Sequence, residues 1–336
     1  MGVYPLLQIV VRNILLLGNQ LKWNEQEYLT EDALAAVKAL LPDQAEGDLS
    51  NVCFWADEVR HHYHYRWSAP LHYVDTPDFL CNYKYCRDCH DGHGHMDRCV
   101  TGAIYNYSMQ LSQGYYDLNS EKYNLTEALM FLSHFVGDVH QGSSSVSVVL
   151  CFSYESSSRI TCIVLGWTRT RRVQIPDKKS YEIVRWTSSN LKLPLHVGFI
   201  GDLGGNTIVV RWYRRKTNLH HVWDTMIIES ALKTYYKSDI MLMIQALMKN
   251  ITDGWSDEVP SWEDCPKLVC PDPYASESIH LACKFAYRNA TPGSTLTDDY
   301  FLSRRPVVEK RLAQSGVRLA EVLNRIFTKK PSVVAQ

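Results

Sequence analysis

Hydrophobic side chains recur at helical spacing over most of the chain, and the pattern is clearest between Asn124 and Gln141. There leucine, phenylalanine and valine side chains return every three or four positions and predict a helix with one buried face. Thr126 is the predicted N-cap, and Glu127 follows in the first turn, where a carboxylate favours the positive helix end. Similar patterns predict helices at residues 30–41, 49–60, 100–111, 220–236, 239–251, 274–287 and 299–327, the last broken or kinked at Pro306.

Strand patterns are rare by comparison. Residues 207–213 alternate well enough to form one arm of a short hairpin. Residues 66–77 carry Pro and Ser breaks and predict an extended loop, and residues 81–99 form a polar loop rich in Cys, His and Gly. The sequence therefore predicts a mainly α fold with a short β-hairpin, in a single helical domain over residues 28–327.

Residues 142–193 interrupt this pattern directly after the helix at 124–141. They contain eleven serines and no histidine, and their strand-like fragments stand among helix-rich surroundings. They carry a net charge of +5, against −6 for the rest of the chain. One interpretation is a surface insertion, and the other is non-native sequence such as a translated intron. We favour the second because a mixture of serine and hydrophobic residues without a regular pattern under-specifies a fold.

The composition indicates a folded globular protein, since 46% of the 336 residues are hydrophobic and 21% are charged. No run of 18 apolar residues occurs, so no membrane-spanning helix is predicted. The mildly acidic body argues against a non-specific DNA coat, which would use a basic face. It does not exclude a nuclease whose metal ions supply the positive charge.

Cysteines and glycosylation motifs indicate an oxidising, secretory compartment. The chain has ten cysteines, and two of the intervals between them, Cys89 to Cys99 and Cys265 to Cys270, close short loops. Four N-x-S/T motifs predict glycosylation at Asn106, Asn124, Asn250 and Asn289. Residues 2–17 are apolar but are broken by Gln8 and Arg12, so the expected signal peptide is not convincing.

Two histidine–aspartate pairs carry the candidate chemistry. His134 and Asp138 are four residues apart on the predicted helix, and His220 and Asp224 repeat the spacing. Residues four apart project from the same side of a helix. Such a pair is either a satisfied buried ion pair or a pair of metal ligands. Two pairs favour a multinuclear metal site. Imidazoles and carboxylates suit catalytic zinc, and the candidate ligands are Asp57, His72, His134, Asp138, His196, His220 and Asp224.

The remaining motifs extend the same chemistry over most of the chain. If residues 142–193 are left out, the sequence around Gln141 becomes LSHFVGDVHQPLHVGF. This string, with FWADEVR, SAPLHYVDTP, DCHDGHG and YRRKTNLHHVWD in the same order, is very similar to plant and fungal zinc-dependent nucleases of the S1/P1 type. That family is related in fold to zinc-dependent phospholipase C, and the resemblance is closest to the plant endonucleases.

The resemblance implies a role for each candidate residue. Asp57, His72, His134 and Asp138 resemble the ligands of one zinc, and His196, His220 and Asp224 those of a second. Asp138 also resembles the carboxylate that bridges to a third zinc. Arg60 resembles an arginine that contacts the scissile phosphate, and Tyr73 and Asp75 match positions that stack on and hydrogen-bond a base. The pairs Cys81–Cys283, Cys89–Cys99 and Cys265–Cys270 resemble the disulfides of the family.

The implied activity is zinc-dependent hydrolysis of single-stranded DNA and RNA to products with 5′-phosphates, together with 3′-nucleotidase activity, in nucleic-acid catabolism. Asp57 would orient the nucleophile as well as bind metal. The family resemblance also implies a secreted, extracellular or vacuolar, monomeric protein. The alternatives are a catalytically inactive product on the same scaffold and a zinc phosphodiesterase of the phospholipase C type.

Two departures from the family pattern change what we expect of this chain. Family members begin with a tryptophan and a nearby histidine that bind the third zinc, and residues 1–27 show nothing similar. The 52-residue segment 142–193 separates Asp138 from His196. We therefore expect at most two well-formed zinc sites and impaired activity. Cys53 and Cys86 are left without an assigned partner.

Other histidines and a basic run fit simpler interpretations. His61, His62 and His64 are interpreted as loop or surface residues, and His90, His93 and His95 as part of a disulfide loop that could also pass for a small metal site. His140 is expected outside the ligand shell. The basic run Arg214–Lys216 could lie near nucleic acid or form a solvated face.

Overall fold

The protein is described here by a computed structural model that covers residues 28–117, 122–140, 149–153, 160–164 and 196–328. Within these residues the fold is mainly helical, as the periodicity predicts. Its α-helices are α2 (Glu31–Leu40), α3 (Trp55–Val59), α4 (Tyr85–Asp88), α5 (Val100–Tyr116), α6 (Leu125–His140), α7 (Leu219–His221), α8 (Ile227–Tyr235), α9 (Ile240–Lys249), α10 (Val259–Glu263), α11 (Pro271–Leu281) and α12 (Asp298–Thr328). In this described part, no helix has both the length and the apolar character needed to cross a bilayer.

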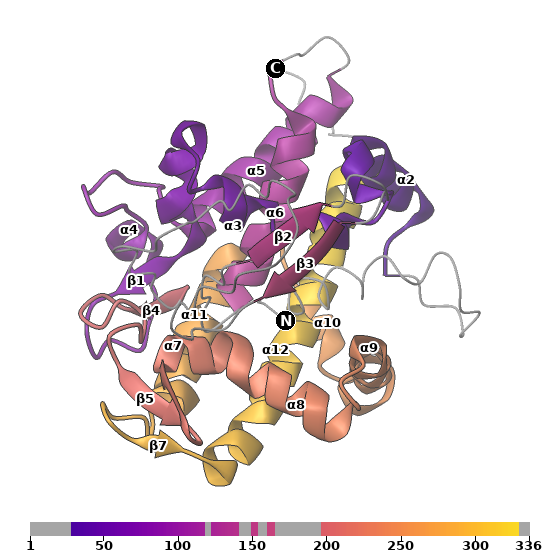
Figure 1. The fold of residues 1–336 in the computed structure, drawn as a ribbon. Helices are drawn as coiled ribbons and strands as arrows, with labels where there is room; N and C mark the ends of the chain where they lie inside the picture. The colour runs from indigo at the N-terminus through magenta and orange to yellow at the C-terminus, as the bar shows by residue number, and fades with distance from the viewer. Residues whose placement is uncertain (1–27, 118–121, 141–148, 154–159, 165–195, 329–336) are drawn as a thin grey trace, which may run out of the picture.

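Helix α6 is the centre of the molecule. Figure 1 shows it beside α5, with α12 running along it, and every residue of α6 from Ala128 to His140 is buried. Phe131 and Phe135, one turn apart, form a stacked pair with ring centroids 5.4 Å apart, and Phe131 also stacks on Tyr107 of α5 at 4.9 Å. Because α2, α5, α11 and α12 all pack against α6, side chains on its last turns lie in a rigid, water-poor environment.

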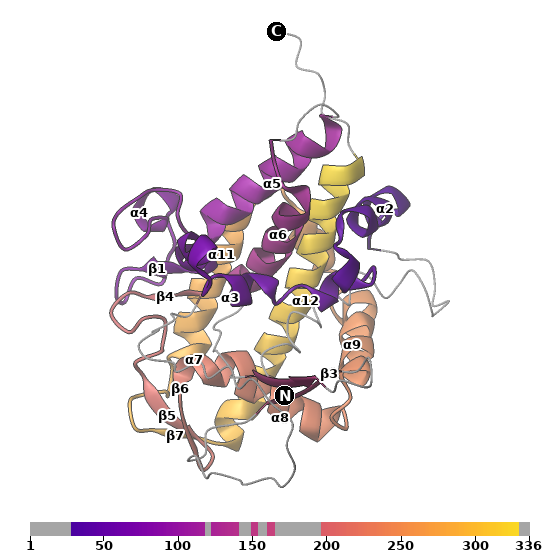
Figure 2. The same cartoon turned by 45° about the horizontal axis from the view of Figure 1, so that its top comes forward.

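Two small sheets bring distant segments together beside this helical core. Strand β1 (Val74–Thr76) pairs in parallel with β4 (Val197–Phe199), in the register Val74↔Val197. Strand β5 (Val209–Trp212) lies between β6 (Arg215–Asn218), which is antiparallel, and β7 (Thr295–Leu296), which is parallel. Strand β5 falls within the predicted hairpin arm, and both views place β5 and β7 next to α7 (Figures 1 and 2).

Three local predictions were wrong. Asn124, and not Thr126, caps α6, because Asn124 Oδ1 accepts a hydrogen bond of 3.2 Å from the Glu127 N–H, while Thr126 Oγ1 donates to the Leu40 carbonyl. Helix α12 continues past Pro306, so of the predicted break or kink the break does not occur. The missing N–H would have bonded the carbonyl of Leu302, whose residue is 51% exposed, so water can satisfy it.

The third difference concerns the segment before β1. Residues 63–72 form a 3-10 helix where an extended loop was predicted, and the predicted helix at 49–60 is divided between a 3-10 turn at Leu49–Asn51 and α3. Short 3-10 pieces are common connectors between longer elements. These short helices set the directions of two predicted ligands, because Asp57 lies inside α3 and His72 is the last residue of the 3-10 helix.

The atypical segments fall mostly outside the described residues. Residues 1–27 do, and so does most of 142–193. Within 142–193, strands β2 (Val149–Ser153) and β3 (Ile160–Val164) pair antiparallel with each other.

Three disulfides hold the described part of the chain, and they are the three pairs that the family resemblance implies. Cys81–Cys283 joins segments 202 residues apart, whereas Cys89–Cys99 and Cys265–Cys270 close short loops. Cys53 is a buried free thiol and Cys86 an exposed one.

Candidate metal centre

Six elements direct the predicted ligand side chains toward the C-terminal half of α6. His134 and Asp138 come from α6 itself, Asp57 from α3 and His72 from the end of the 3-10 helix. The pairing of β1 with β4 carries His196 to the same place, because the Val74 N–H donates to the His196 carbonyl at 2.7 Å. His220 lies in α7, and Asp224 lies in the π-helical turn Val222–Met226 that follows.

Asp57, His72 and His134 form a group of side chains able to hold a metal ion, and Asp138 lies against it. His134 Nε2 lies 3.7 Å from Asp57 Oδ2, 3.2 Å from Asp138 Oδ2 and 3.1 Å from His72 Nδ1. His72 Nδ1 lies 3.7 Å from Asp57 Oδ1 and 3.0 Å from Asp138 Oδ2. A tetrahedral zinc with bonds of about 2.0–2.1 Å separates its ligand atoms by about 3.3 Å. These four side chains therefore fit one zinc ion.

The second predicted ligand set is connected to the first through Asp138. While Asp138 Oδ2 faces His72 and His134, its Oδ1 lies 3.6 Å from His196 Nε2. His220 Nε2 lies 3.5 Å from Asp224 Oδ2, and the rings of His196 and His220 have centroids 6.2 Å apart. This set is looser than the first: in the described part of the chain, the three side chains whose ligand atoms all lie within 4.8 Å of one another are Asp57, His72 and His134. Its donor chemistry, two imidazoles and a carboxylate, still suits zinc.

Three of the four imidazoles are oriented by backbone carbonyls. His134 Nδ1–H donates to the Cys53 carbonyl at 2.6 Å and His220 Nδ1–H to the Gly204 carbonyl at 2.9 Å, while His196 Nδ1–H donates to the His72 carbonyl. Each bond fixes the tautomer and makes Nε2 the ring atom able to bind a metal, which is the usual arrangement of histidine ligands. His72 differs, because its Nδ1 faces the carboxylates.

Burial and charge make this a strongly coupled group of ionisable side chains. Burial lowers the pKa of His72 to about 4, and Arg60 acts in the same direction. Burial also disfavours the charged form of His134, but Asp138 and Asp57 outweigh it and raise the pKa of His134 to about 9. Burial alone would raise the pKa of Asp138, yet His134 and His196 hold it below its ordinary value. Asp138 is thus a carboxylate, as a ligand must be.

Arg60 lies at the edge of the first ligand group. Its guanidinium is buried, and its Nη2 forms an ion pair with Asp57 Oδ1 at 2.9 Å. Burial raises the pKa of Asp57, but Arg60, His134 and His72 together bring it below the ordinary value. Arg60 Nε is buried and has no hydrogen-bond partner among the described residues. A buried arginine with a donor to spare, beside candidate metal ligands, can bind an anionic oxygen.

Tyr73 and Asp75 follow His72 directly along the chain, and both are half-buried. Burial, with Asp202 and Asp78 nearby, raises the pKa of Asp75 well above its ordinary value. Asp75 Oδ1 is buried and, among the described residues, has no hydrogen-bond partner. A carboxyl group in this state can both donate and accept, as the edge of a nucleobase requires.

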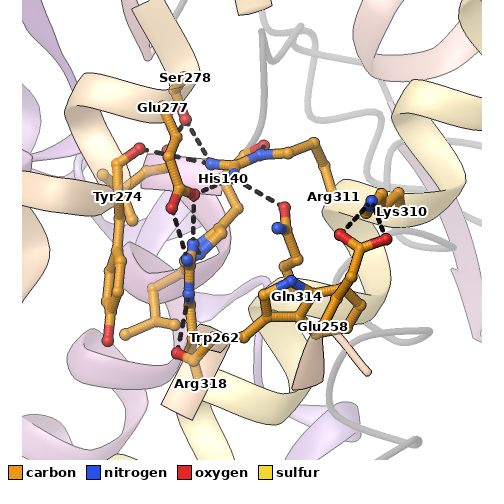
Figure 3. A network of polar contacts seen from close by, with 12 residues as sticks. His140, Glu258, Trp262, Tyr274, Glu277, Ser278, Lys310, Arg311, Gln314 and Arg318 are labelled. Carbon is orange, nitrogen blue, oxygen red and sulfur yellow. Dashed lines mark hydrogen bonds and ion pairs between the residues drawn. The ribbon is translucent and has the colours of Figure 1, made fainter. Parts of the chain in front are cut away.

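Sequence reasoning missed the polar cluster that holds the end of α6, which Figure 3 shows. His140 Nδ1–H donates to the Val136 carbonyl at 2.7 Å, and His140 Nε2 accepts from Arg318 Nη1 of α12 at 2.9 Å. Arg318 and Arg311, two helical turns apart, share Glu277 of α11, with N–O distances of 2.7 Å. The sequence did hold a signal of this cluster, because Arg311 and Arg318 lie seven residues apart on the apolar face of a predicted helix.

This cluster also caps the α6 backbone. Ser278 Oγ donates to the Val139 carbonyl at 2.6 Å, and Arg311 Nε donates to the His140 carbonyl at 3.4 Å. The last carbonyls of a helix lack intrahelical partners and form its negative end, so cationic donors stabilise them. The turn that carries Asp138 is therefore held by α11 and α12.

The other predicted polar groups lie outside the metal-ligand group. His61, His62 and His64 belong to the segment after α3, and His95 Nδ1 lies 3.0 Å from Asp91 Oδ2 in the loop closed by Cys89–Cys99. Of the four predicted glycosylation positions, Asn106, Asn124 and Asn289 are exposed and Asn250 is half-buried. Whether they carry glycans stays a prediction.

Comparison with known proteins gives consistent matches over nearly the whole chain. A family model described as S1/P1 nuclease matches residues 25–142 and 174–328. Endonuclease 4 of Arabidopsis thaliana is 57% identical over 311 residues, which cover 91% of this chain and 86% of that protein. Endonuclease 5 of the same plant is 51% identical over 91% of this chain and 87% of its own length. Nuclease P1 of Penicillium citrinum is 26% identical over 90% of this chain and 93% of its own length.

Proposed function

The chain belongs to the S1/P1 nuclease family, a zinc-dependent family of hydrolases that act on phosphodiester bonds, and from that premise we propose that it is an endonuclease for single-stranded DNA and RNA. Its products would carry 5′-phosphates, and it would also remove the phosphate of 3′-nucleotides. The observation that carries the proposal is the set of 3.0–3.7 Å separations among the ligand atoms of Asp57, His72, His134 and Asp138, which suits one zinc ion.

Zinc bound by these side chains would supply a water nucleophile near neutral pH and positive charge for the phosphoryl oxygens. His196, His220 and Asp224 would hold a second ion, and Asp138 would join the two sites through its two oxygens. We propose two zinc sites built from the described residues.

The protein's own groups would position the substrate. Arg60 would donate to a non-bridging oxygen of the scissile phosphate, where negative charge increases during in-line attack. Asp57, kept ionised by Arg60 and the two histidines, would accept a hydrogen bond from the attacking water and so fix its direction. Burial of the ligand turn of α6 excludes bulk water from these interactions.

Preference for single strands would come from Tyr73 and Asp75. A ring can stack on a base, and a carboxyl can hydrogen-bond its edge, only when that base is not paired and stacked in a duplex. The raised pKa of Asp75 supports this role, because a protonated carboxyl offers a donor and an acceptor to the base.

A secretory location is also part of the proposal. Three disulfides in the described residues fit an oxidising compartment, and the protein would act as a monomer outside the cell or in the vacuole.

The test is an activity assay of the zinc-loaded protein on single-stranded DNA, single-stranded RNA, duplex DNA, 3′-AMP and phosphatidylcholine vesicles, each with and without chelator. We expect chelator-sensitive cleavage of both single-stranded substrates. Asp57→Asn should abolish cleavage, whereas Asp257→Asn, an exposed aspartate outside the site, should not. Cleavage of lipid alone would favour a phospholipase C-type phosphodiesterase, and a zinc-loaded protein without any activity would identify an inactive member of the family.

A further inference from the structure

A basic face on the β5–β6 hairpin lies apart from the metal centre and is not used by the proposed chemistry. Arg211 on β5 and Lys216 on β6 are directly opposite each other in the antiparallel register, and both are exposed. Arg214 lies in the connection between the two strands and is also exposed. We call Arg211, Arg214 and Lys216 the hairpin basic face.

The cross-strand pair is unfavourable by itself. Residues directly opposite on antiparallel strands have Cβ atoms about 4.5–5.5 Å apart, and like charges there destabilise the sheet. The neighbouring position on β7, which pairs with Arg211, is Thr295 and brings no negative charge. The row across this face of the sheet is therefore Lys216, Arg211 and Thr295.

No acidic side chain of the described residues forms an ion pair with this basic face. Basic residues on α12 behave differently, since Arg305 pairs with Glu309 at 3.0 Å and Lys310 with Glu258 at 2.5 Å. A lysine on an edge strand also blocks unwanted strand pairing, and this would account for Lys216 on β6. It does not account for Arg211, because β5 is the central strand of the sheet.

The hairpin leads directly into the metal centre. Strand β6 ends at Asn218, whose side chain caps α7 by accepting from the His221 N–H at 2.7 Å, and His220 is in that helix. Lys216 is two residues before Asn218, or about 7 Å along the strand. Arg215, on the other face of the hairpin, contacts the π-helical turn that carries Asp224, because its Nη1 lies 4.0 Å from Met226 Sδ. Figure 2 shows β5, β6 and β7 grouped beside α7.

On the premise that the substrate is a single-stranded nucleic acid, we infer that the hairpin basic face binds phosphates of the strand beyond the nucleotide that is cleaved. Such contacts add affinity without sequence preference, because they address the backbone alone. They serve only substrates long enough to extend from the metal centre along β6. The unfavourable Arg211–Lys216 pair is relieved when a phosphate lies between the two cations.

The test compares the double variant Arg211→Gln/Lys216→Gln with the unaltered protein on two substrates, an oligothymidylate of 20 nucleotides and the dinucleotide TpT. We expect kcat/KM on the long substrate to fall about tenfold at low salt, as for the loss of two charge contacts. The slope of log kcat/KM against log salt should become shallower by about 1.4, since each single-strand phosphate contact contributes about 0.7. TpT has one phosphate, the one that is cleaved, so it offers none to the hairpin basic face and should be cleaved as before.

The matched control is Lys233→Gln/Lys249→Gln, which removes the same charge from exposed positions on α8 and α9. An equal fall in kcat/KM on the long substrate in this control would mean that the overall charge, and not the hairpin basic face, acts on the substrate. That result would overturn the inference. So would an unchanged salt slope in the hairpin variant. The melting temperature of the hairpin variant should stay equal or rise, because a repulsive pair is removed.

The two proposals fail in different ways. If the unaltered protein cleaves neither substrate, the proposed function is wrong. Fluorescence anisotropy with labelled oligothymidylate needs no cleavage and then still tests whether the hairpin basic face binds the strand. Weaker binding by the hairpin variant than by its control supports the inference, and equal binding overturns it.

Discussion

Arg318 on α12 donates a hydrogen bond of 2.9 Å to His140, the last residue of α6, although the two are 178 residues apart in sequence. Both side chains are buried, and the histidine uses its other ring nitrogen to bond the carbonyl one turn back. Burial, with Arg311 and Arg318 beside it, lowers the pKa of His140 well below its ordinary value, so the ring is a neutral acceptor. The helix that carries His134 and Asp138 is thereby tied to α12, the longest helix among the described residues.

Arg318→Met should therefore destabilise the protein by about 2–4 kcal/mol, because Glu277 and His140 Nε2 each lose a buried hydrogen-bond donor while Arg311 still pairs with Glu277. The measurement is urea unfolding of the metal-free protein. Arg325→Met on the same helix is the control, since Arg325 contacts the partly exposed Glu321 and two carbonyls, and it should lose about 1 kcal/mol or less. Equal losses in the two variants would contradict the role of the cluster.

Asp138→Asn should reduce zinc affinity by at least about 100-fold, because the substitution removes a buried charge that faces three of the histidines. Zinc content by mass spectrometry and chelator competition measure the effect, and circular dichroism should show that the helices remain. Asp257→Asn, at an exposed position, should bind zinc normally. Full zinc occupancy in Asp138→Asn would refute the assignment of this residue as a ligand.

Zinc binding should strengthen with pH. In the metal-free protein the pKa of His134 is raised to about 9 by Asp138 and Asp57 against the effect of burial, so zinc must displace a proton below that pH. We expect affinity to rise about tenfold per pH unit between about 6.5 and 9, in chelator competition at several pH values. His134→Asn should flatten this dependence. A pH-independent affinity in the unaltered protein would show that His134 is already neutral.

The same shift predicts how the metal-free fold responds to pH. Because the folded-state pKa of His134 lies above the ordinary value of 6.5, its protonation stabilises the fold fully below about pH 6.5. That contribution is lost as the pH rises through 9. Thermal melts of the metal-free protein should show a falling melting temperature over this window, and zinc-loaded protein should not.

The two kinds of disulfide should differ in what they contribute. Replacing Cys81 and Cys283 by serine removes a cross-link between residues 202 positions apart and should destabilise the protein by about 5 kcal/mol. Replacing Cys265 and Cys270, only 5 residues apart, should destabilise it by about 2 kcal/mol. The reason is that a cross-link restricts the unfolded chain more when it closes a longer loop. Denaturant unfolding of the two double variants measures the difference, and a larger effect of the short loop would contradict this account.

Local sequence patterns were enough to predict part of this protein. The helical spacing of α6, the placement of His134 and Asp138 on one side of it, and the predominance of helix all follow from periodicity, which records contacts within a turn or two of the chain. The resemblance to zinc-dependent nucleases extended this to the ligand list. The N-cap of α6 was predicted wrongly, and the break considered at Pro306 does not occur, because both depend on which neighbouring group or solvent meets the backbone.

Other features depend on the tertiary structure alone. Packing of α3 and the 3-10 helix against α6 sets the 3.0–3.7 Å separations around Asp57, His72 and His134, and the β1–β4 pairing brings His196 to Asp138. The Arg318–His140 bond and the facing of Arg211 with Lys216 come from helix contact and strand register. Sequence spacing cannot specify these relationships, because the distance between residues far apart in the chain is set by how whole elements pack.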